Sequence, residues 1–281
     1  MNDTSARGRE HAIEGALLAC GLVSLALTLG TLGLLGEQTL AALGEPAGLG
    51  GLEIGGLLAG TCLTSLIAIV VALPLGLLAA IHLAEFASAS ALRVLRPTLD
   101  ILSAIPTIVF AWLALLVLTP ALQRVVPGLA DHNALAPGIA MGLMLVPMIA
   151  SLGEDAIRAV PLGLRDAARG LGAGELATIV HVVLPAASSG LVAIFGLAIS
   201  RVFGETLIVA LAAGREPHAS ADPRVAIETM SAYLVEVGQR GASPGTLEYR
   251  TLFVVAAGLF ALTSVIHLVA RRLARRLREG E

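Results

Sequence analysis

The sequence predicts an all-α integral membrane protein with six transmembrane helices. Of its 281 residues, 56% are hydrophobic and only 14% are charged, and the mean hydropathy is +0.87. A soluble domain with a water-facing surface needs more charge than this. Several apolar runs also reach the roughly 20 residues that a helix needs to cross a bilayer. Together these observations predict one helical membrane domain.

The first two apolar runs cover residues 15–36 and 54–84. The first contains no charged residue and follows a polar head, so we expect a membrane-spanning helix. A glycine-rich polar stretch at 37–53 separates the two runs. The second run is interrupted by Pro74 and is longer than one straight span requires, which predicts a tilt or a kink.

The third and fourth runs cover residues 101–122 and 134–153. Arg93 and Arg96 mark a short loop before the third run. Each run has about the length of a spanning helix, so both are predicted to cross the membrane. The region that follows, 154–185, carries several charges that keep it out of lipid, and we assign it to an aqueous loop.

The fifth and sixth runs cover residues 186–213 and 251–270. The fifth contains the charged residues Arg201 and Glu205, whereas the sixth contains no Asp, Glu, Lys or Arg. The long segment between them, 214–250, has apolar residues at helical spacing, which predict a short surface helix. These residues are Ile227, Met230, Leu234 and Val237.

The arginines predict how the helices are oriented. All 18 basic residues are arginine, because the chain has no lysine. Twelve lie in the N-terminal head, the loop around Arg93, the loop 154–185 and the tail 271–281, and five lie in the segments on the opposite side. Cytoplasmic segments carry an excess of basic residues, so both termini are predicted to be cytoplasmic. We ascribe the tail arginines to this topology rather than to a specific lipid site.

These patterns divide the chain into three parts. Residues 1–54 form a cytoplasmic head, the first transmembrane helix and an outer loop. Residues 55–270 form the main transmembrane domain, which includes the cytoplasmic loop 154–185. A basic cytoplasmic tail covers 271–281. The expected location is the cytoplasmic (inner) membrane of a bacterium.

Two charged residues in the fifth predicted span are candidates for transport chemistry. Arg201 and Glu205 are four residues apart and would share one helix face, and an arginine near mid-membrane costs about 3 kcal/mol. Gly196, Ser200 and Gly204 recur every four residues beside them, a seam that permits close helix packing. We interpret Arg201 as lining an anion path, with Glu205 orienting it or repelling wrongly charged occupants. A structural ion pair is the alternative.

The loop 154–185 contains a motif with defined spacing. A triplet of one acidic and two alanine residues is followed after three residues by a glycine, and after nine more by Val-Val-Leu-Pro. A glycine between two short helices permits a sharp turn, and the small alanines let the loop fit into a groove on a partner. An ordinary helical hairpin is the alternative. The motif residues are Asp166, Ala167, Ala168, Gly172, Leu184 and Pro185.

This spacing resembles the coupling loop of ABC importer permeases, in which Glu-Ala-Ala precedes a glycine and an Ile-x-Leu-Pro sequence. Asp166 replaces the glutamate and Val182 the isoleucine. The segments Ile-Pro-Thr-Ile-Val-Phe at 105–110 and Arg-Val-Phe-Gly-Glu-Thr at 201–206 resemble phosphate-specific permeases in particular. The resemblance covers about residues 55–270 and implies the type I ABC importer permease fold.

Phosphate-specific permeases come as two related subunits, and this sequence resembles the PstC type more than the PstA type at 204–209. The resemblance implies that Arg201, Glu205 and, more weakly, Thr206 belong to the phosphate path, and that the motif loop couples to an ATPase. The implied partners are PstB-like ATP-binding-cassette subunits, a second, PstA-like permease subunit and an extracytoplasmic PstS-like phosphate-binding protein.

The expected function is therefore that of a permease subunit of an ATP-driven phosphate importer, working by alternating access. Without lysine the chain has no Walker A motif, so ATP hydrolysis falls to another polypeptide and no enzymatic activity or cofactor is expected. The histidines lack ligand spacing, so no metal site is expected, and nothing indicates nucleic-acid binding. A permease for sulfate, molybdate or tungstate and an ion-coupled secondary transporter are the alternatives.

Overall fold

The computed structural model describes residues 3–44, 53–243 and 245–279, and every regular element in these ranges is a helix. The prediction of an all-α protein is thus confirmed. The elements are α1 (Asp3–Leu43), α2 (Ile54–Ile81), η1 (His82–Phe86), α3 (Ala89–Ser103), α4 (Thr107–Leu113), η2 (Ala114–Leu118), α5 (Thr119–Gln123), α6 (Leu135–Arg158), α7 (Leu162–Gly170), α8 (Glu175–Thr178), η3 (Ile179–Val183), α9 (Leu184–Ala186), α10 (Ser188–Phe203), α11 (Leu207–Ala212), α12 (Met230–Gln239) and α13 (Leu247–Glu279).

Four helical segments are long and apolar enough to cross a bilayer. They are 13–43 in α1, 54–86 in α2 and η1, 135–158 in α6, and 248–277 in α13. Two further spans result if each of two bent helix pairs counts as one span. The described residues therefore contain four to six candidate spans, which fits a multi-span membrane protein.

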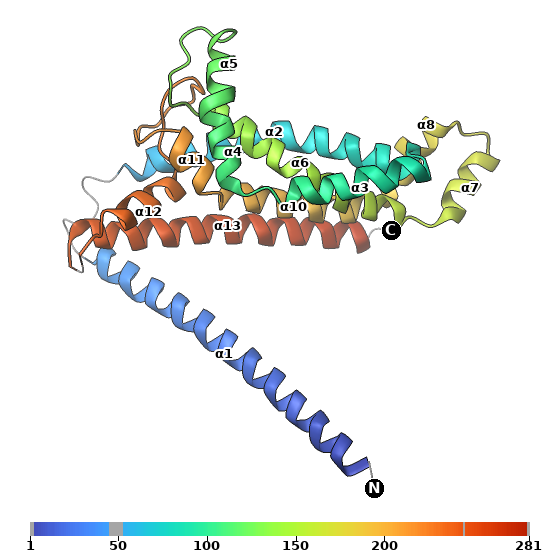
Figure 1. The fold of residues 1–281 in the computed structure, drawn as a ribbon, viewed down its shortest axis with the longest axis horizontal. Helices are drawn as coiled ribbons and strands as arrows, with labels where there is room; N and C mark the ends of the chain where they lie inside the picture. Colours follow the sequence, from blue (N-terminus) through green and yellow to red (C-terminus); the bar gives the residue numbers. More distant parts are fainter. Residues whose placement is uncertain (1–2, 45–52, 244, 280–281) are drawn as a thin grey trace.

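Helix α1 stands apart from the other helices. In Figure 1 it leaves the bundle beside the start of α13 and runs away from it at an angle, and none of its most apolar stretch is buried. Near its end, Thr39 donates a hydrogen bond of 3.2 Å to the carbonyl of Phe253 in α13. The helix continues to Leu43, so the first part of the stretch 37–53 is helical; residues 45–52 lie outside the described ranges.

The centre of the bundle is the pair α2 and α6, which lie side by side (Figure 1). Glycines let their backbones approach each other. A Cβ atom added to Gly142 would lie 2.7 Å from the side chain of Val71, and one added to Gly76 would lie 2.6 Å from Ile149. These distances are shorter than van der Waals contact, so the packing requires glycine at both positions.

The third predicted span, 101–122, is sharply bent near its start. Helix α3 ends at Ser103, α4 begins at Thr107, and the two helices meet at 86°. Pro106 accounts for the break, because proline lacks an N–H and disfavours the helical conformation in the residue before it. The predicted loop at Arg93 and Arg96 is wrong, since both residues lie within α3.

The fifth predicted span, 186–213, is likewise interrupted. Helix α10 ends at Phe203, residues 204–206 are not helical, and α11 begins at Leu207. At its other end, α10 meets the segment 175–186 at an angle of 69°. The span is therefore built from separate helices, and hydropathy alone does not reveal the breaks.

The segment between α11 and α12 packs across one end of α2. A Cβ atom on Gly60 would lie 2.3 Å from the carbonyl oxygen of Glu228, and Thr61 accepts a hydrogen bond of 2.9 Å from the backbone N–H of Met230. The predicted surface helix is confirmed as α12, although Ile227 precedes it in non-helical backbone. Glycine in α2 thus makes room for the polar backbone of this segment.

Candidate functional site

The last turn of α10 places Arg201 at a cavity of about 240 Å³ between α10, α3 and α6. Two serine hydroxyls and one carboxylate share the lining with Arg201. The arginine lies about 8 Å along the helix axis, at 1.5 Å per residue, from Gly196, which contacts Ala270 at the end of the apolar run 251–270, so it is level with that run. The lining residues are Asp100, Ser103, Ile105, Met144, Met148, Ser151, Leu152 and Arg201.

Arg201 has an exposed, unneutralised guanidinium group. Within the described residues it forms no ion pair shorter than 4.0 Å and no side-chain hydrogen bond. Asp100 lines the same cavity without forming an ion pair with it. A guanidinium group offers several N–H donors in a planar fork that matches the oxygens of an oxyanion. This cavity can therefore receive an anion with oxygen acceptors.

Three of these lining residues were not predicted from the sequence. Asp100 and Ser103 come from α3 and Ser151 from α6. Their segments are about 50 and 100 residues away from Arg201 in the chain, and a single serine or aspartate in an apolar stretch has no distinctive spacing. The only available signal was a polar residue near an expected span. The fold, not the local sequence, brings them together.

Glu205 does not share a helix face with Arg201, because α10 ends before it. Its carboxylate accepts a hydrogen bond of 3.2 Å from the backbone N–H of Leu207, and its carbonyl accepts one of 2.7 Å from Ser231 in α12. The Thr206 hydroxyl donates 3.1 Å to the carbonyl of Gly204. A helix break in an apolar environment leaves backbone N–H and C=O groups that need hydrogen-bond partners. Glu205 and Thr206 provide such hydrogen bonds at the break between α10 and α11.

The three small residues of the predicted seam have different surroundings. A Cβ atom on Gly196 would lie 2.2 Å from the Cβ of Ala270, so α10 and α13 meet closely there. The Ser200 hydroxyl donates 2.9 Å to the carbonyl of Gly196 within its own helix. A Cβ atom on Gly204 would approach only the carbonyls of its own turn, at 3.7 Å. Of the three glycine and serine positions, Gly196 makes the tight helix–helix contact.

The motif loop forms two short helices, α7 and α8, joined by a turn. Gly172 has a φ of +88°, a conformation that L side chains rarely adopt, and the N–H of Ala173 bonds back to the carbonyl of Ala168 at 3.0 Å. Figure 1 shows this hairpin projecting from one end of the bundle. Asp166 and Ala167 are exposed, whereas Ala168 is buried. Leu184 and Pro185 begin α9, behind the hairpin.

Large apolar side chains are exposed on this hairpin. Leu171 at the turn is 91% exposed, and Leu162 and Leu176 on the two sides are 73% and 70% exposed. Large apolar side chains at the tip of a charged loop are not covered by any described part of the chain. Such side chains at a projecting turn are typical of a protein interface.

A buried ion pair joins the hairpin to the bundle, and sequence reasoning did not find it. Arg165 in α7 contacts Glu85 in η1 at 2.6 Å, and the two side chains are only 10% and 7% exposed. Arg165 also donates 2.7 Å to the carbonyl of Ile157 in α6. Arg165 therefore links α7, η1 and α6. The partners are 80 residues apart, so no local pattern pairs them.

A second ion-pair cluster lies beside the first. Glu154 in α6 is 2% exposed and accepts from Arg96 in α3 at 2.6 Å and from Arg158 at 2.7 Å. Arg158 also donates 3.0 Å to the carbonyl of Leu83. Charge-assisted hydrogen bonds therefore fix η1, the middle of α3 and the end of α6 to one another near the hairpin.

At the other end of the bundle, Glu228 is a buried acid. Glu228 precedes α12 in the chain, and the residue is 5% exposed. Burial, with a further contribution from the charge of Glu236, raises the pKa of Glu228 to about 7, while Arg240 and Arg215 act in the opposite direction. Among the described residues, no group of three or more His, Cys, Asp or Glu side chains is placed to hold a metal ion.

Comparison with known proteins gives the family. The family described as binding-protein-dependent transport system inner membrane component matches residues 72–279. YqgH, a probable ABC transporter permease protein of Bacillus subtilis, is 29% identical over 217 residues, which cover 77% of this chain and 70% of that protein. The phosphate transport system permease protein PstC of Mesorhizobium japonicum is 29% identical, with 78% of this chain and 72% of the relative covered.

A further relative is matched over a shorter part. The phosphate transport system permease protein PstA 1 of Mycobacterium tuberculosis (strain CDC 1551 / Oshkosh) is 36% identical over 157 residues, which cover 55% of this chain and 49% of the relative. The present chain thus matches about half the length of that protein.

Solved structures of ABC transporters have a fold similar to that of this chain. A bacterial alginate ABC transporter, in complex with a periplasmic protein that holds an alginate pentasaccharide, matches with a TM-score of 0.70 at 14% identity and covers 99% of this chain and 98% of its own. An inward-facing MetNI methionine ABC transporter matches with a TM-score of 0.58 at 22% identity, over 80% of this chain and 94% of its own. This chain belongs to the family of binding-protein-dependent transport system inner membrane components.

Proposed function

We propose that this chain is one permease subunit of an ATP-driven phosphate importer and forms half of the transmembrane pathway. The observation that carries the proposal is the unpaired Arg201 guanidinium at a cavity within the span, beside the hydroxyls of Ser103 and Ser151. An arginine at this depth is costly unless it serves a ligand or an ion pair. Relatives named as phosphate transport permeases support phosphate as the ligand.

A second subunit completes the pathway. Several groups that line the Arg201 cavity are exposed, including Asp100, Ser103 and Arg201 itself. In a membrane these groups would face lipid unless another protein covers them. We therefore place a second permease subunit, PstA-like by resemblance, against α3, α6 and α10. The long exposed apolar surface of α1 is available to the same partner or to lipid.

The α7–α8 hairpin is the proposed contact for the ATP-binding-cassette subunits. Its exposed leucines and the small, exposed Ala167 fit a groove on a soluble partner, and the buried pair Arg165–Glu85 links it to the bundle. Closure of two ATPases would move the hairpins and, with them, the ends of α2 and α6. This assignment places the hairpin and both termini in the cytoplasm, and it places the phosphate-binding protein at the opposite face.

One residue favours phosphate over sulfate. Near neutral pH a phosphate ion carries a proton that it can donate in a hydrogen bond, whereas sulfate carries none. Asp100 in the Arg201 cavity is an acceptor for such a proton and repels an anion that offers none. Glu205 and Thr206, one turn beyond Arg201, shape the mouth of the path rather than pair with its arginine.

Affinity purification of the tagged chain from detergent-solubilised membranes, followed by mass spectrometry, tests the assignment. We expect an ATP-binding-cassette subunit and a second six-span permease in the purified complex, and ATP-dependent uptake of labelled phosphate after reconstitution. Competition by sulfate, molybdate and tungstate then identifies the preferred oxyanion. Uptake by the chain alone in ATP-depleted, energised vesicles would instead establish a secondary transporter.

A further inference from the structure

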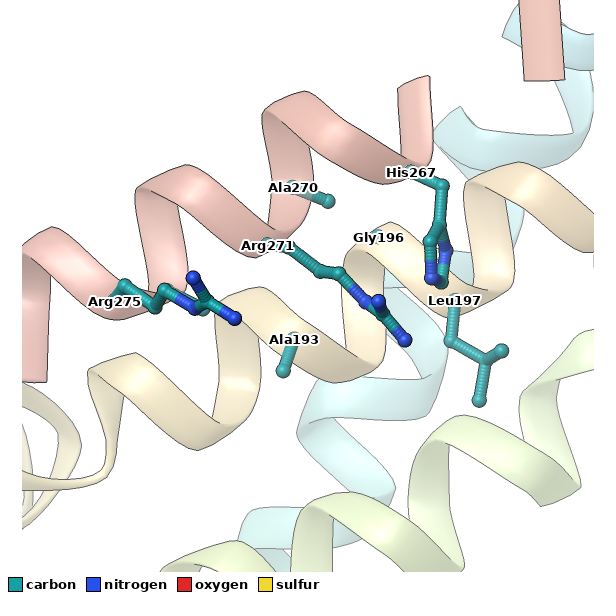
Figure 2. A pocket seen from close by; sticks show the side chains of 8 residues that line it. Ala193, Gly196, Leu197, His267, Ala270, Arg271 and Arg275 are labelled. Carbon is teal, nitrogen blue, oxygen red and sulfur yellow. The ribbon is translucent and has the colours of Figure 1, made fainter. Parts of the chain in front are cut away.

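A groove between α10 and α13 lies away from the Arg201 cavity. It has a volume of about 320 Å³ and is built from the first half of α10 and the last turns of α13. Figure 2 shows Arg271, Arg275 and His267 extending from α13 toward α10. The remaining wall is apolar. The lining residues are Ala193, Gly196, Leu197, His267, Ala270, Arg271, Ala274 and Arg275.

The three basic side chains occupy one stripe of α13. His267, Arg271 and Arg275 are spaced by four residues and therefore share a helix face. No acidic residue lines the groove, and within the described ranges neither arginine forms an ion pair. Arg272 and Arg276 lie on the same two turns but do not line it. The groove thus has positive charge without an internal counter-ion.

The position along α13 sets the level of these charges in the membrane. The apolar run 251–270 is about 30 Å long as a helix, which equals the hydrocarbon thickness of a bilayer. Arg271 and Arg275 follow it directly and therefore lie at the headgroup level on the hairpin side of the membrane. The close contact between Gly196 and Ala270 forms the floor of the groove.

A second hollow continues along the same two helices toward the membrane interior. It has a volume of about 450 Å³ and shares His267 with the first. Its lining combines hydroxyl groups with an apolar side chain: Ser200, Thr263, Ser264, His267 and Leu268. A molecule with an anionic head, a polar ester region and an apolar chain matches this order of surfaces.

We propose that the α10–α13 groove binds one anionic phospholipid, which changes, for Arg271 and Arg275, the sequence-based interpretation that topology alone accounts for the tail arginines. The phosphate of its headgroup contacts Arg271 and Arg275, and an acyl chain runs past Leu197 and Leu268 toward the membrane interior. Basic residues near a membrane surface attract anionic lipid, and two in one groove direct that attraction to a single place. The site is independent of the anion that the protein transports.

Lipid retention measured by native mass spectrometry tests this. The full chain, purified with its subunits, is titrated with phosphatidylglycerol or with phosphatidylcholine of the same acyl chains. The groove variant Arg271→Gln/Arg275→Gln is compared with the control variant Arg272→Gln/Arg276→Gln, which removes the same charge from the same turns. We expect preferential retention of phosphatidylglycerol by the wild type and the control. The groove variant should bind it about tenfold more weakly than the control does.

A third variant separates a lipid from a free anion. Thr263→Trp fills the second hollow, where the acyl chain lies, and leaves every charge in place, so it should also lose phosphatidylglycerol, and inorganic phosphate should not displace the lipid from the wild type. Equal losses in the two arginine variants would overturn the proposal, because the attraction would then be diffuse. Displacement by inorganic phosphate together with normal binding by Thr263→Trp would overturn it in favour of a free-anion site.

Discussion

The arginines at the hairpin end and the arginine of the α10 cavity have opposite environments. Arg165 is buried against Glu85, and Arg96 and Arg158 share Glu154, so their donors are used within the protein. Arg201 has no such partner among the described residues. The first group fixes helices to one another, and the second remains available for a ligand. Pairing, rather than charge alone, distinguishes the arginines that hold helices together from Arg201.

The largest expected effect tests the unpaired side of this comparison. Arg201→Ala should abolish phosphate uptake, a loss of at least about 100-fold, because no other basic side chain lines the cavity. Assembly should persist, since Arg201 makes no ion pair that the fold depends on. Uptake of labelled phosphate in reconstituted vesicles measures the loss, and Arg124→Ala, at an exposed site after α5, is the matched control. Normal uptake by Arg201→Ala would remove this residue from the path.

The second-largest expected effect tests the paired arginines at the hairpin end. Glu85→Ala leaves Arg165 buried without its counter-charge and should lower the free energy of unfolding by about 3–5 kcal/mol. The double variant Glu85→Met/Arg165→Met should recover most of this loss, because no isolated charge is buried. Thermal unfolding of the solubilised protein measures stability. The ATPase activity per phosphate transported shows whether the double variant still couples ATP hydrolysis to transport. Equal stability of Glu85→Ala and the wild type would contradict the structural role of the ion pair.

A third prediction concerns pH. The pKa of Glu228 is about 7 in the folded protein and 4.5 in its ordinary state, so the folded protein holds the proton more tightly. The free energy of unfolding should therefore fall as pH rises from 4.5 to 7 and then stay level. Glu228→Gln removes this dependence and should be more stable than the wild type above pH 7, by about 3 kcal/mol. Parallel stability–pH curves for the two proteins would refute the assignment.

The smallest effect sharpens the description of the cavity. Asp100→Asn keeps the size of the side chain but removes its negative charge and adds an N–H donor, so it should tolerate sulfate better. The ratio of phosphate to sulfate uptake should fall about tenfold. Asp131→Asn, an exposed aspartate outside the cavity, serves as the control. An unchanged ratio would mean that Asp100 does not contact the transported anion.

Hydropathy predicted the membrane class and most apolar segments because burial in lipid acts on the whole length of a helix. It did not predict where those helices break. Pro74 and Pro147 lie inside helices that continue, whereas Pro106 coincides with an 86° bend, so proline alone is an ambiguous signal. The break at Gly204 has no proline and depends on contacts with α12.

The candidate site was predictable only in part for a related reason. Arg201 is visible because a charge in an apolar run is rare and costly. Asp100 and Ser151 join it through tertiary packing between segments far apart in the chain. The same holds for Glu85 and Arg165, whose pairing follows from the return of α7 onto the end of α2 and not from any spacing.

The non-helical residues between α10 and α11 have a mechanical consequence. A continuous helix transmits tilt and rotation from one end to the other, but three non-helical residues act as a pivot between two lever arms. Helix α10 packs against α13 at Gly196, whereas the break itself is held to α12 by the bond from Ser231 to the Glu205 carbonyl. In the proposed transport cycle, Arg201, on the final turn before the break, would therefore move with α10 while the break stays tied to α12.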